Sequence, residues 1–280
     1  MISLINLNDA LENIKSLIEN AIKLDGEAGK KAAINSSQII NTLHEVVKSD
    51  LIRKGVSPEL INPSLGSTTP EIKIAGFLKF KTQDVCVFPN CFEPIQENID
   101  FNGLHTGKTD QYGELFSEHI LSINLRSQLS SLAKNKDTMY ERTYAEPLNL
   151  HRRLPKMVLG EVYLLSAREL DSNEVKKRNV VYKPVTPRMA KALEEYIFGF
   201  AALNRRVTQG DDFFKYERIA LLIADFSQNP VKIYESVDEL KSEGLLPSNS
   251  NCTLSNLVYS GFIDDLLSIY ERRFGAGIFR

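Results

Sequence analysis

Three polar side chains, each in its own stretch of patterned sequence, have the chemistry of a metal site. Asp84 opens the apolar run DVCVF, Asn124 lies in LSINLRSQ, and Glu146 lies in YERTYAEPLNLHRR. Hard divalent cations such as Mg²⁺ prefer oxygen ligands and keep several waters, so two carboxylates together with phosphate oxygens can suffice. Asp84 and Glu146 are therefore candidate ligands of Mg²⁺ or Mn²⁺, and Asn124 lies between them in the chain.

Both acids also have a purely structural interpretation. An aspartate beside a strand often forms a turn, because its carboxylate accepts hydrogen bonds from nearby backbone amides. Thr143 and Glu146 have the Thr-x-x-Glu spacing of a capping box, in which the glutamate satisfies a free amide at the start of a helix. The sequence leaves these interpretations open.

The segment LSINLRSQ, residues 121–128, alternates apolar and polar residues, as a half-buried strand does. Its polar face carries Asn124 and Arg126 at neighbouring positions. This face is either simply exposed to water or part of a site that includes the two acids.

Basic residues are concentrated around this strand, although the formal net charge of the chain is -2. Between Ser122 and Lys156, seven Lys and Arg face three Asp and Glu, a local net charge of +4. A local basic surface attracts anions even on a slightly acidic molecule; chance clustering on a solvated surface is the alternative. The candidate phosphate contacts are Lys134, Lys136, Arg152 and Arg153.

Several common sites are missing from the sequence. It contains no GxxxxGK(S/T), GxGxxG, HExxH or GxSxG motif, which removes many common enzyme classes. Three cysteines are too few for a disulfide framework, and Cys86 and Cys91 lack a second pair that would complete a zinc site. With neither a secretory signal nor an apolar stretch long enough to span a membrane, we expect a cytoplasmic protein.

The hydrophobic pattern predicts alternating helices and strands. The mixture indicates one α/β domain over residues 1–280, with a central mixed sheet flanked by helices and with residues 1–56 as a helical N-terminal portion. Pro147 is expected in the first turn of a helix or at a kink. The expected helices are 4–23, 36–55, 129–156, 187–206 and 253–274, and the expected strands are 72–80, 84–88, 119–125, 157–165 and 217–226.

The succession TQDVCVFP, LSINLRSQ and ERTYAEPLNLHRRLPKMVLGEVYLL resembles the catalytic core of type II restriction endonucleases of the PD-(D/E)XK class. The resemblance covers about residues 75–170 and is closest to the subgroup whose second acidic ligand has moved from the strand to the next helix. It implies a restriction-endonuclease-like fold, with Asp84 as the motif aspartate and Glu146 as the moved acid. Asp110, fourteen residues before Asn124, is a lesser alternative for the first acid.

One residue of the family pattern is missing. The strand that should carry a polar residue and a lysine two positions apart has Ser122, Asn124 and Arg126. Arginine supplies charge but does not release a proton at neutral pH, and asparagine is uncharged. Either a lysine from elsewhere, such as Lys134 or Lys136, takes this role, or the site is atypical or inactive.

The resemblance implies a Mg²⁺-dependent, sequence-specific endonuclease for double-stranded DNA. A homodimer is expected, since a palindromic site matches a two-fold symmetric protein. A cognate DNA methyltransferase would be the genetic partner that protects the host. The alternatives are a catalytically inactive DNA-binding or assembly protein with the same fold, and a cytoplasmic interaction protein that uses its helical ends.

Overall fold

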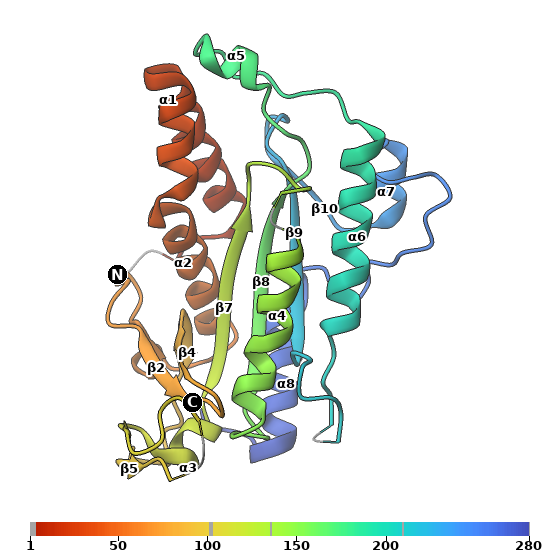
Figure 1. The fold of residues 1–280 in the computed structure, drawn as a ribbon. Coiled ribbons are helices and arrows are strands. Elements are labelled where there is room, and N and C mark those ends of the chain that lie inside the picture. Colours follow the sequence, from red (N-terminus) through yellow and green to blue (C-terminus); the bar gives the residue numbers. More distant parts are fainter. Residues whose placement is uncertain (1–3, 101–102, 135, 209, 280) are drawn as a thin grey trace.

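A six-stranded mixed sheet forms the centre of the computed structural model, which describes residues 4–100, 103–134, 136–208 and 210–279 (Figure 1). The strand order is β1-β4-β7-β8-β9-β10. The strands of this sheet are β1 (Ile61–Asn62), β4 (Val85–Val87), β7 (Leu121–Gln128), β8 (Val158–Ser166), β9 (Arg218–Asp225) and β10 (Lys232–Tyr234). Two small two-stranded sheets lie outside it, made of β2 (Ile72–Ala75) with β3 (Phe80–Gln83) and of β5 (Glu97–Asn98) with β6 (Thr109–Asp110).

The three longest strands of the sheet, β7, β8 and β9, are parallel, and the shorter strands at its two ends are antiparallel to their neighbours. Parallel neighbours require a crossover connection. Helix α4 (Lys136–His151) connects β7 to β8, and α6 (Pro187–Leu203) lies between β8 and β9.

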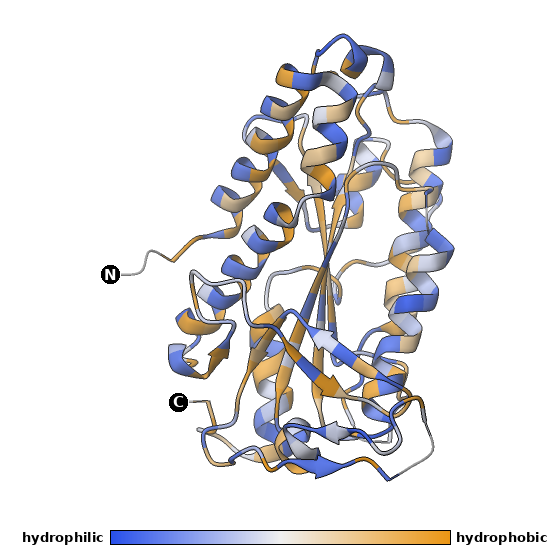
Figure 2. Cartoon of the chain, turned by 60° about the vertical axis from the view of Figure 1, so that its left-hand side comes forward, coloured by the Kyte–Doolittle hydropathy of each residue, from blue (hydrophilic) through white to orange (hydrophobic). Residues whose placement is uncertain are grey.

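One face of the sheet is covered by α1 (Leu7–Asn35), α2 (Ser37–Arg53) and α8 (Phe262–Phe274), whose apolar side chains share one core with β7 and β8. Figure 2 shows the central strands as largely hydrophobic, whereas the helices are hydrophilic over much of their outer surfaces. Helix α8 packs closely at Gly160, where an added Cβ would lie 2.7 Å from Leu266 Cδ1. The predicted N-terminal helical portion therefore lies directly on the central sheet.

The opposite face is covered by α4 and α6, which form a second core with the other side of β8 and β9. The remaining short helices are α3 (Gly113–Glu118), α5 (Ser172–Lys176), α7 (Val237–Ser242) and a 3₁₀ turn at Pro58–Leu60. Among the described helices, none is both long and apolar enough to cross a bilayer.

The predicted α/β class and the strands at 157–165 and 217–226 are confirmed. The predicted strand 72–80 is wrong, because the chain turns at residues 76–79 and returns as β3, so the hairpin lies before Asp84. The final helix is shorter than expected and begins after Gly261, which has a positive φ of 76°. Pro147 lies in the interior of α4, although a proline there leaves one helical carbonyl without its usual donor.

Candidate active site

Asp84 lies where the chain leaves the β2–β3 hairpin and enters the central sheet. Pairing of Val85 with Ile123 places Asp84 one position beyond the β4–β7 ladder, beside Asn124. Asp84 Oδ2 accepts a hydrogen bond from Leu125 N (2.7 Å), and Asp84 N donates to Asn124 Oδ1 (3.2 Å). The carboxylate is thus fixed against β7.

The polar face of β7 points toward α4, away from the core that contains its apolar residues. Gln83 Oε1 accepts hydrogen bonds from Ser122 Oγ (2.6 Å) and Asn124 Nδ2 (3.2 Å). Both Ser122 and Asn124 are buried. Water exposure therefore does not explain the polarity of these two positions, which belong to an ordered hydrogen-bond network.

Glu146 reaches this network from the interior of α4. Its Oε1 accepts a hydrogen bond from Asn124 Nδ2 (3.0 Å), and the side chain is buried. The capping-box interpretation is wrong, because Glu146 is far from the start of the helix and Thr143 Oγ1 donates to Met139 O instead. The helix holds this carboxylate over the strand.

Arg126 joins Glu146 to a further acid, Glu161 of β8. Arg126 Nη2 donates to Glu146 Oε2, and Arg126 Nε lies 2.6 Å from Glu161 Oε1 without the alignment of a hydrogen bond. Glu161 is fully buried and stands opposite Asn124 in the parallel β7–β8 register. We refer to Asp84, Asn124, Arg126, Glu146 and Glu161, together with Lys81 below, as the acid cluster.

A lysine approaches the acid cluster from the hairpin and not from β7. Lys81 Nζ of β3 lies 2.9 Å from Glu146 Oε2, and its side chain is 30% exposed. Of the two lysines considered from the sequence, Lys136 pairs with Glu195, and Lys134 has no ion pair with any described residue. Lys81 is therefore the lysine that the structure brings to Glu146.

Two carboxylates of the acid cluster, Asp84 and Glu161, have a raised pKa, chiefly because they are buried. Burial raises the pKa of Asp84 to about 6 against the opposing Leu125 hydrogen bond, and the charges of Glu71 and Glu146 raise it further. Burial also raises the pKa of Glu161 to about 8; the Arg126 charge opposes this change, while Glu146 and Asp84 add to it. Bringing such groups together is costly unless a cation compensates.

Asp110 and Arg153 lie away from the acid cluster and pair with each other. Arg153 Nη1 donates to Asp110 Oδ2 (2.7 Å) and to Ala75 O (2.9 Å), and both charged side chains are buried. In this conformation Arg153 is not presented to a phosphate, and Asp110 does not join Glu146. Arg152, in contrast, is exposed, with its guanidinium carbon 5.9 Å from the centre of the Phe77 ring.

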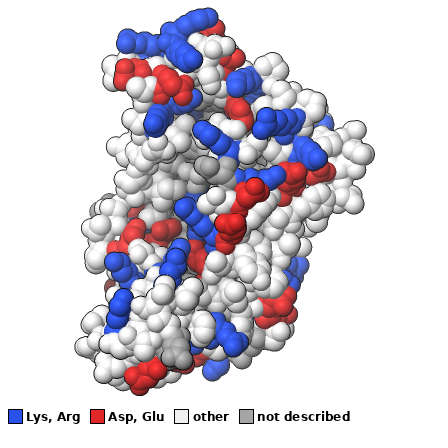
Figure 3. All heavy atoms as spheres, viewed as in Figure 1, with Lys and Arg blue, Asp and Glu red and all other residues white. Residues whose placement is uncertain are grey.

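The local excess of basic residues does not produce one positive surface. Figure 3 shows Lys and Arg interleaved with Asp and Glu on the face that carries α4. Arg126, Lys136 and Arg153 all form ion pairs with acids. Fewer Lys and Arg side chains are therefore available to bind an external anion than the local net charge of the sequence indicates.

The donors of the acid cluster suit a hard cation. Asp84 Oδ1 accepts no hydrogen bond from a described residue, and carboxylate oxygens are ligands that Mg²⁺ prefers. Within the described residues, no three His, Cys, Asp or Glu side chains are grouped closely enough to hold a metal ion by themselves. Asp84 and Glu146 could hold such a cation only if other oxygens, from substrate or water, completed its ligands.

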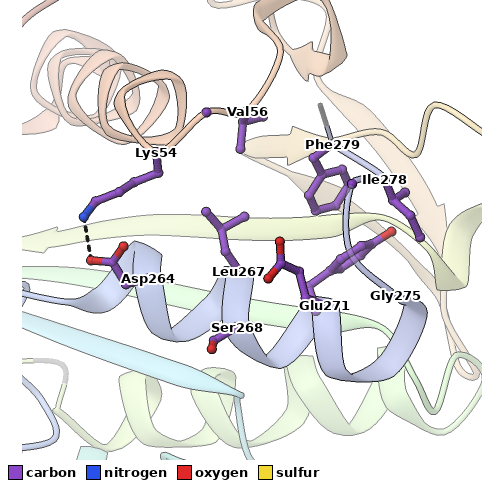
Figure 4. Close-up of a pocket in the computed structure, with 12 residues that line it drawn as sticks. Lys54, Val56, Asp264, Leu267, Ser268, Glu271, Gly275, Ile278 and Phe279 are labelled. Carbon is purple, nitrogen blue, oxygen red and sulfur yellow. Dashed lines mark hydrogen bonds and ion pairs between the residues drawn. The ribbon is translucent and has the colours of Figure 1, made fainter.

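Open space adjoins the acid cluster on one side. A pocket of about 410 Å³ lies between the ends of β7 and β8 and the first turns of α4, and Arg126 is part of its wall. A different pocket, of about 290 Å³, lies between the end of α2 and α8 (Figure 4), where Lys54 points toward Asp264 (2.7 Å). None of the residues in the acid cluster lines that second pocket.

Comparison with family models, with curated proteins and with solved structures finds no match for this chain. A functional proposal therefore depends on the acid cluster itself.

Sequence reasoning did not identify Glu161 or Lys81. Glu161 is a single acid inside the apolar run MVLGEVYLL, and a charge at such a position needs a partner, which was the one signal that could have drawn attention to it. Lys81 gave no local signal, because a lysine near a hairpin is ordinary on a protein surface.

Proposed function

We propose that this protein is a metal-dependent endonuclease that hydrolyses phosphodiester bonds of double-stranded DNA. The supporting observation is the meeting of Asp84, Asn124, Arg126 and Glu146 in one cluster, since the resemblance to PD-(D/E)XK endonucleases implies the two acids and the polar residue, with Arg126 near the place of the missing lysine. The four residues come from a strand entrance, a neighbouring strand and a helix. Their contact through buried hydrogen bonds is more specific than the spacing in the sequence.

Each side chain has a separate task in this proposal. Asp84 and Glu146 would hold Mg²⁺, which lowers the pKa of bound water and stabilises charge on the phosphate. Asn124 fixes Glu146 through the 3.0 Å hydrogen bond and fixes the start of β4 through its Oδ1. The two carboxylates are thereby held in one orientation before substrate binds.

Lys81 and Arg126 supply the positive charge. Both side chains can donate hydrogen bonds to the phosphate, but a lysine ammonium can also transfer a proton, whereas Arg126 does not release one at neutral pH. Arg126 has a fixed place between two acids and stabilises charge by position. Lys81 accordingly takes the role of the lysine that β7 lacks.

DNA cleavage in Mg²⁺ or Mn²⁺ tests the proposal directly. We expect discrete fragments from plasmid or phage DNA, and a loss of at least about 100-fold in Asp84→Ala, beyond the loss typical of residues that merely support a metal ligand. Asp212→Ala, at an exposed aspartate that pairs with Lys215, is the matched control. Absence of cleavage on varied DNA, or full activity in Asp84→Ala, would contradict it.

A second candidate function is a DNA-binding or assembly protein that does not cleave. It is favoured by one observation: Lys81 and Arg126 already balance the charge of Glu146, so the site is neutralised by the protein's own cations. This alternative predicts DNA retention in the presence of a chelator and no nicking after metal is added.

The partners of the endonuclease follow from its substrate. A palindromic DNA site would be read by a homodimer, and a methyltransferase gene beside this one would protect the host's DNA. The mass of the protein bound to a short duplex, measured by light scattering, distinguishes one subunit from two.

A further inference from the structure

The pocket beside Arg126 has the side chains of an anion site. It lies where the parallel strands β7 and β8 end, the edge at which open α/β sheets commonly bind ligands. Its volume of about 410 Å³ falls in the range of small-molecule sites. Arg126, Thr138, Arg142 and Tyr163 contribute to its wall, and no acid does.

The two arginines leave positive charge toward this space. Arg126 uses Nε and Nη2 for the two glutamates, and its Nη1 has no acceptor among the described residues. Arg142, two turns into α4 and exposed, has no hydrogen bond or ion pair with any described residue. The pocket thus has one arginine fixed by the acid cluster and one that is free to move.

Tyr163 provides the second, independent indication of a ligand. The residue is only 4% exposed, yet its hydroxyl has no hydrogen-bond partner in the described part of the chain. Tyr163 contributes to the wall of the pocket, next to Arg126 in the β7–β8 register. A buried hydroxyl costs free energy unless it is paired, so a partner in the pocket would offset that cost.

We propose that this pocket binds a phosphate group, with Arg126, Arg142 and the Tyr163 hydroxyl as its donors. Guanidinium groups with a hydroxyl beside them match the oxygens of a phosphate, and charge-assisted hydrogen bonds of this kind are the strong ones. The first turns of α4 add the positive end of a helix dipole. The ligand is the DNA backbone phosphate next to the bond that is cleaved; this part rests on the proposed endonuclease function.

The position of the pocket explains how one side chain serves two phosphates. Arg126 faces Glu146 with one edge of its guanidinium and the pocket with another. A strand bound across the cluster would therefore place one phosphate near Asp84 and Glu146 and its neighbour near Arg142. The pocket sets the register of the strand relative to the acids.

Titration of the metal-free protein with inorganic phosphate, followed by NMR, tests the pocket without any DNA. We expect shifts at Arg142 and Tyr163, with affinity about tenfold weaker in Arg142→Ala and severalfold weaker in Tyr163→Phe, which keeps the ring. Arg272→Ala, at an exposed arginine of α8 on the opposite layer, should leave affinity unchanged. Phosphate affinity that is the same in both pocket variants as in the wild type overturns the proposal.

Cleavage kinetics separate this inference from the function on which it rests. If both hold, Arg142→Ala raises KM for DNA about tenfold and changes kcat less than threefold, because the residue positions the strand. If the wild type cleaves DNA and Arg142→Ala has the same KM, the pocket has no role in DNA binding, while the proposed endonuclease function still stands. Wild-type protein that binds phosphate in the pocket but never cleaves DNA overturns the endonuclease and leaves the phosphate site.

Discussion

Glu161 of β8 and Glu217, which directly precedes β9, are both buried, yet their surroundings differ. Glu217 accepts hydrogen bonds from Leu159 N (2.8 Å), Arg206 Nη1 (2.9 Å) and Arg273 Nη1 (2.8 Å). Glu161 has one ion-pair partner among the described residues, Arg126, and interacts with the Tyr216 hydroxyl, but neither of its oxygens accepts a well-aligned hydrogen bond there. We call the group around Glu217 the arginine cluster.

The pKa values of the two acids move in opposite directions. Burial alone would raise that of Glu217, but His151, Arg273 and Arg206 outweigh burial and lower it to about 2. Burial prevails at Glu161 and raises its pKa to about 8. Burial of an acid therefore does not identify a site; the number of donors around it distinguishes a structural acid from a strained one.

The comparison is tested most strongly by Glu217→Ala. This change leaves Arg206 and Arg273 without their shared carboxylate in the core, which costs about 3–5 kcal/mol when a buried pair loses one partner. The free energy of unfolding in urea measures it. Glu141→Ala, at an exposed position of α4, should change stability by less than about 0.5 kcal/mol. A similarly small effect for Glu217→Ala would show that the arginine cluster is not structural.

Glu161→Gln should increase the free energy of unfolding, whereas Glu217→Ala should decrease it. The unfolded chain releases the Glu161 proton near pH 4.5 and the folded chain near pH 8, so wild-type stability falls as pH rises through this window. Glutamine removes that loss, and we expect the variant to be more stable than wild type at pH 8 by roughly 1–3 kcal/mol, with little difference at pH 4.

Urea unfolding at several pH values, with a chelator present, measures the difference between the two proteins. Using the difference cancels the titrating groups that do not interact with Glu161. A variant whose stability parallels that of the wild type from pH 4 to pH 8 would contradict the raised pKa. Glu161 would then be a structural acid like Glu217.

Local patterns predicted much of the fold and part of the acid cluster. The apolar run at 157–165 could only be a covered strand, and Pro187 marked the start of a helix. Asp84 and Glu146 were selected because two acids beside a polar strand suit a metal, and in the structure both form hydrogen bonds with residues of that strand. These features could be predicted because each depends on residues that are close together in the sequence.

The remaining features depend on contacts between distant segments. Lys81 reaches Glu146 because the chain turns at residues 76–79, whereas the apolar spacing of this stretch suggested a single strand. Arg153 follows Arg152 in sequence, but both lie in the turn after α4 and not in the helix expected over 129–156, and that turn directs Arg153 into the core and Arg152 to solvent. The pattern around α4 is too irregular to reveal which side of the helix is covered.

The acid cluster also differs from the arginine cluster in how it is held, because its lysine lies on a hairpin and not in the core. Asn149, one turn beyond Glu146 in α4, fixes that hairpin: its Oδ1 accepts from Leu78 N (2.8 Å) and Lys79 N (3.1 Å), and its Nδ2 donates to Lys79 O (3.0 Å). Gly76 makes this approach possible, because a Cβ there would lie 2.1 Å from Asn149 Nδ2.

Asn149→Ala should release the hairpin and leave the arginine cluster intact. We expect a loss of about 1 kcal/mol in stability, faster hydrogen exchange at the Leu78 and Lys79 amides, and unchanged exchange at Leu159 N, which bonds to Glu217. Asn256→Ala, at an exposed asparagine whose side chain bonds Arg205, is the matched control. Since Lys81 would lose its fixed place beside Glu146, DNA cleavage should fall together with hairpin protection; full cleavage with an unprotected hairpin would remove Lys81 from the acid cluster's function.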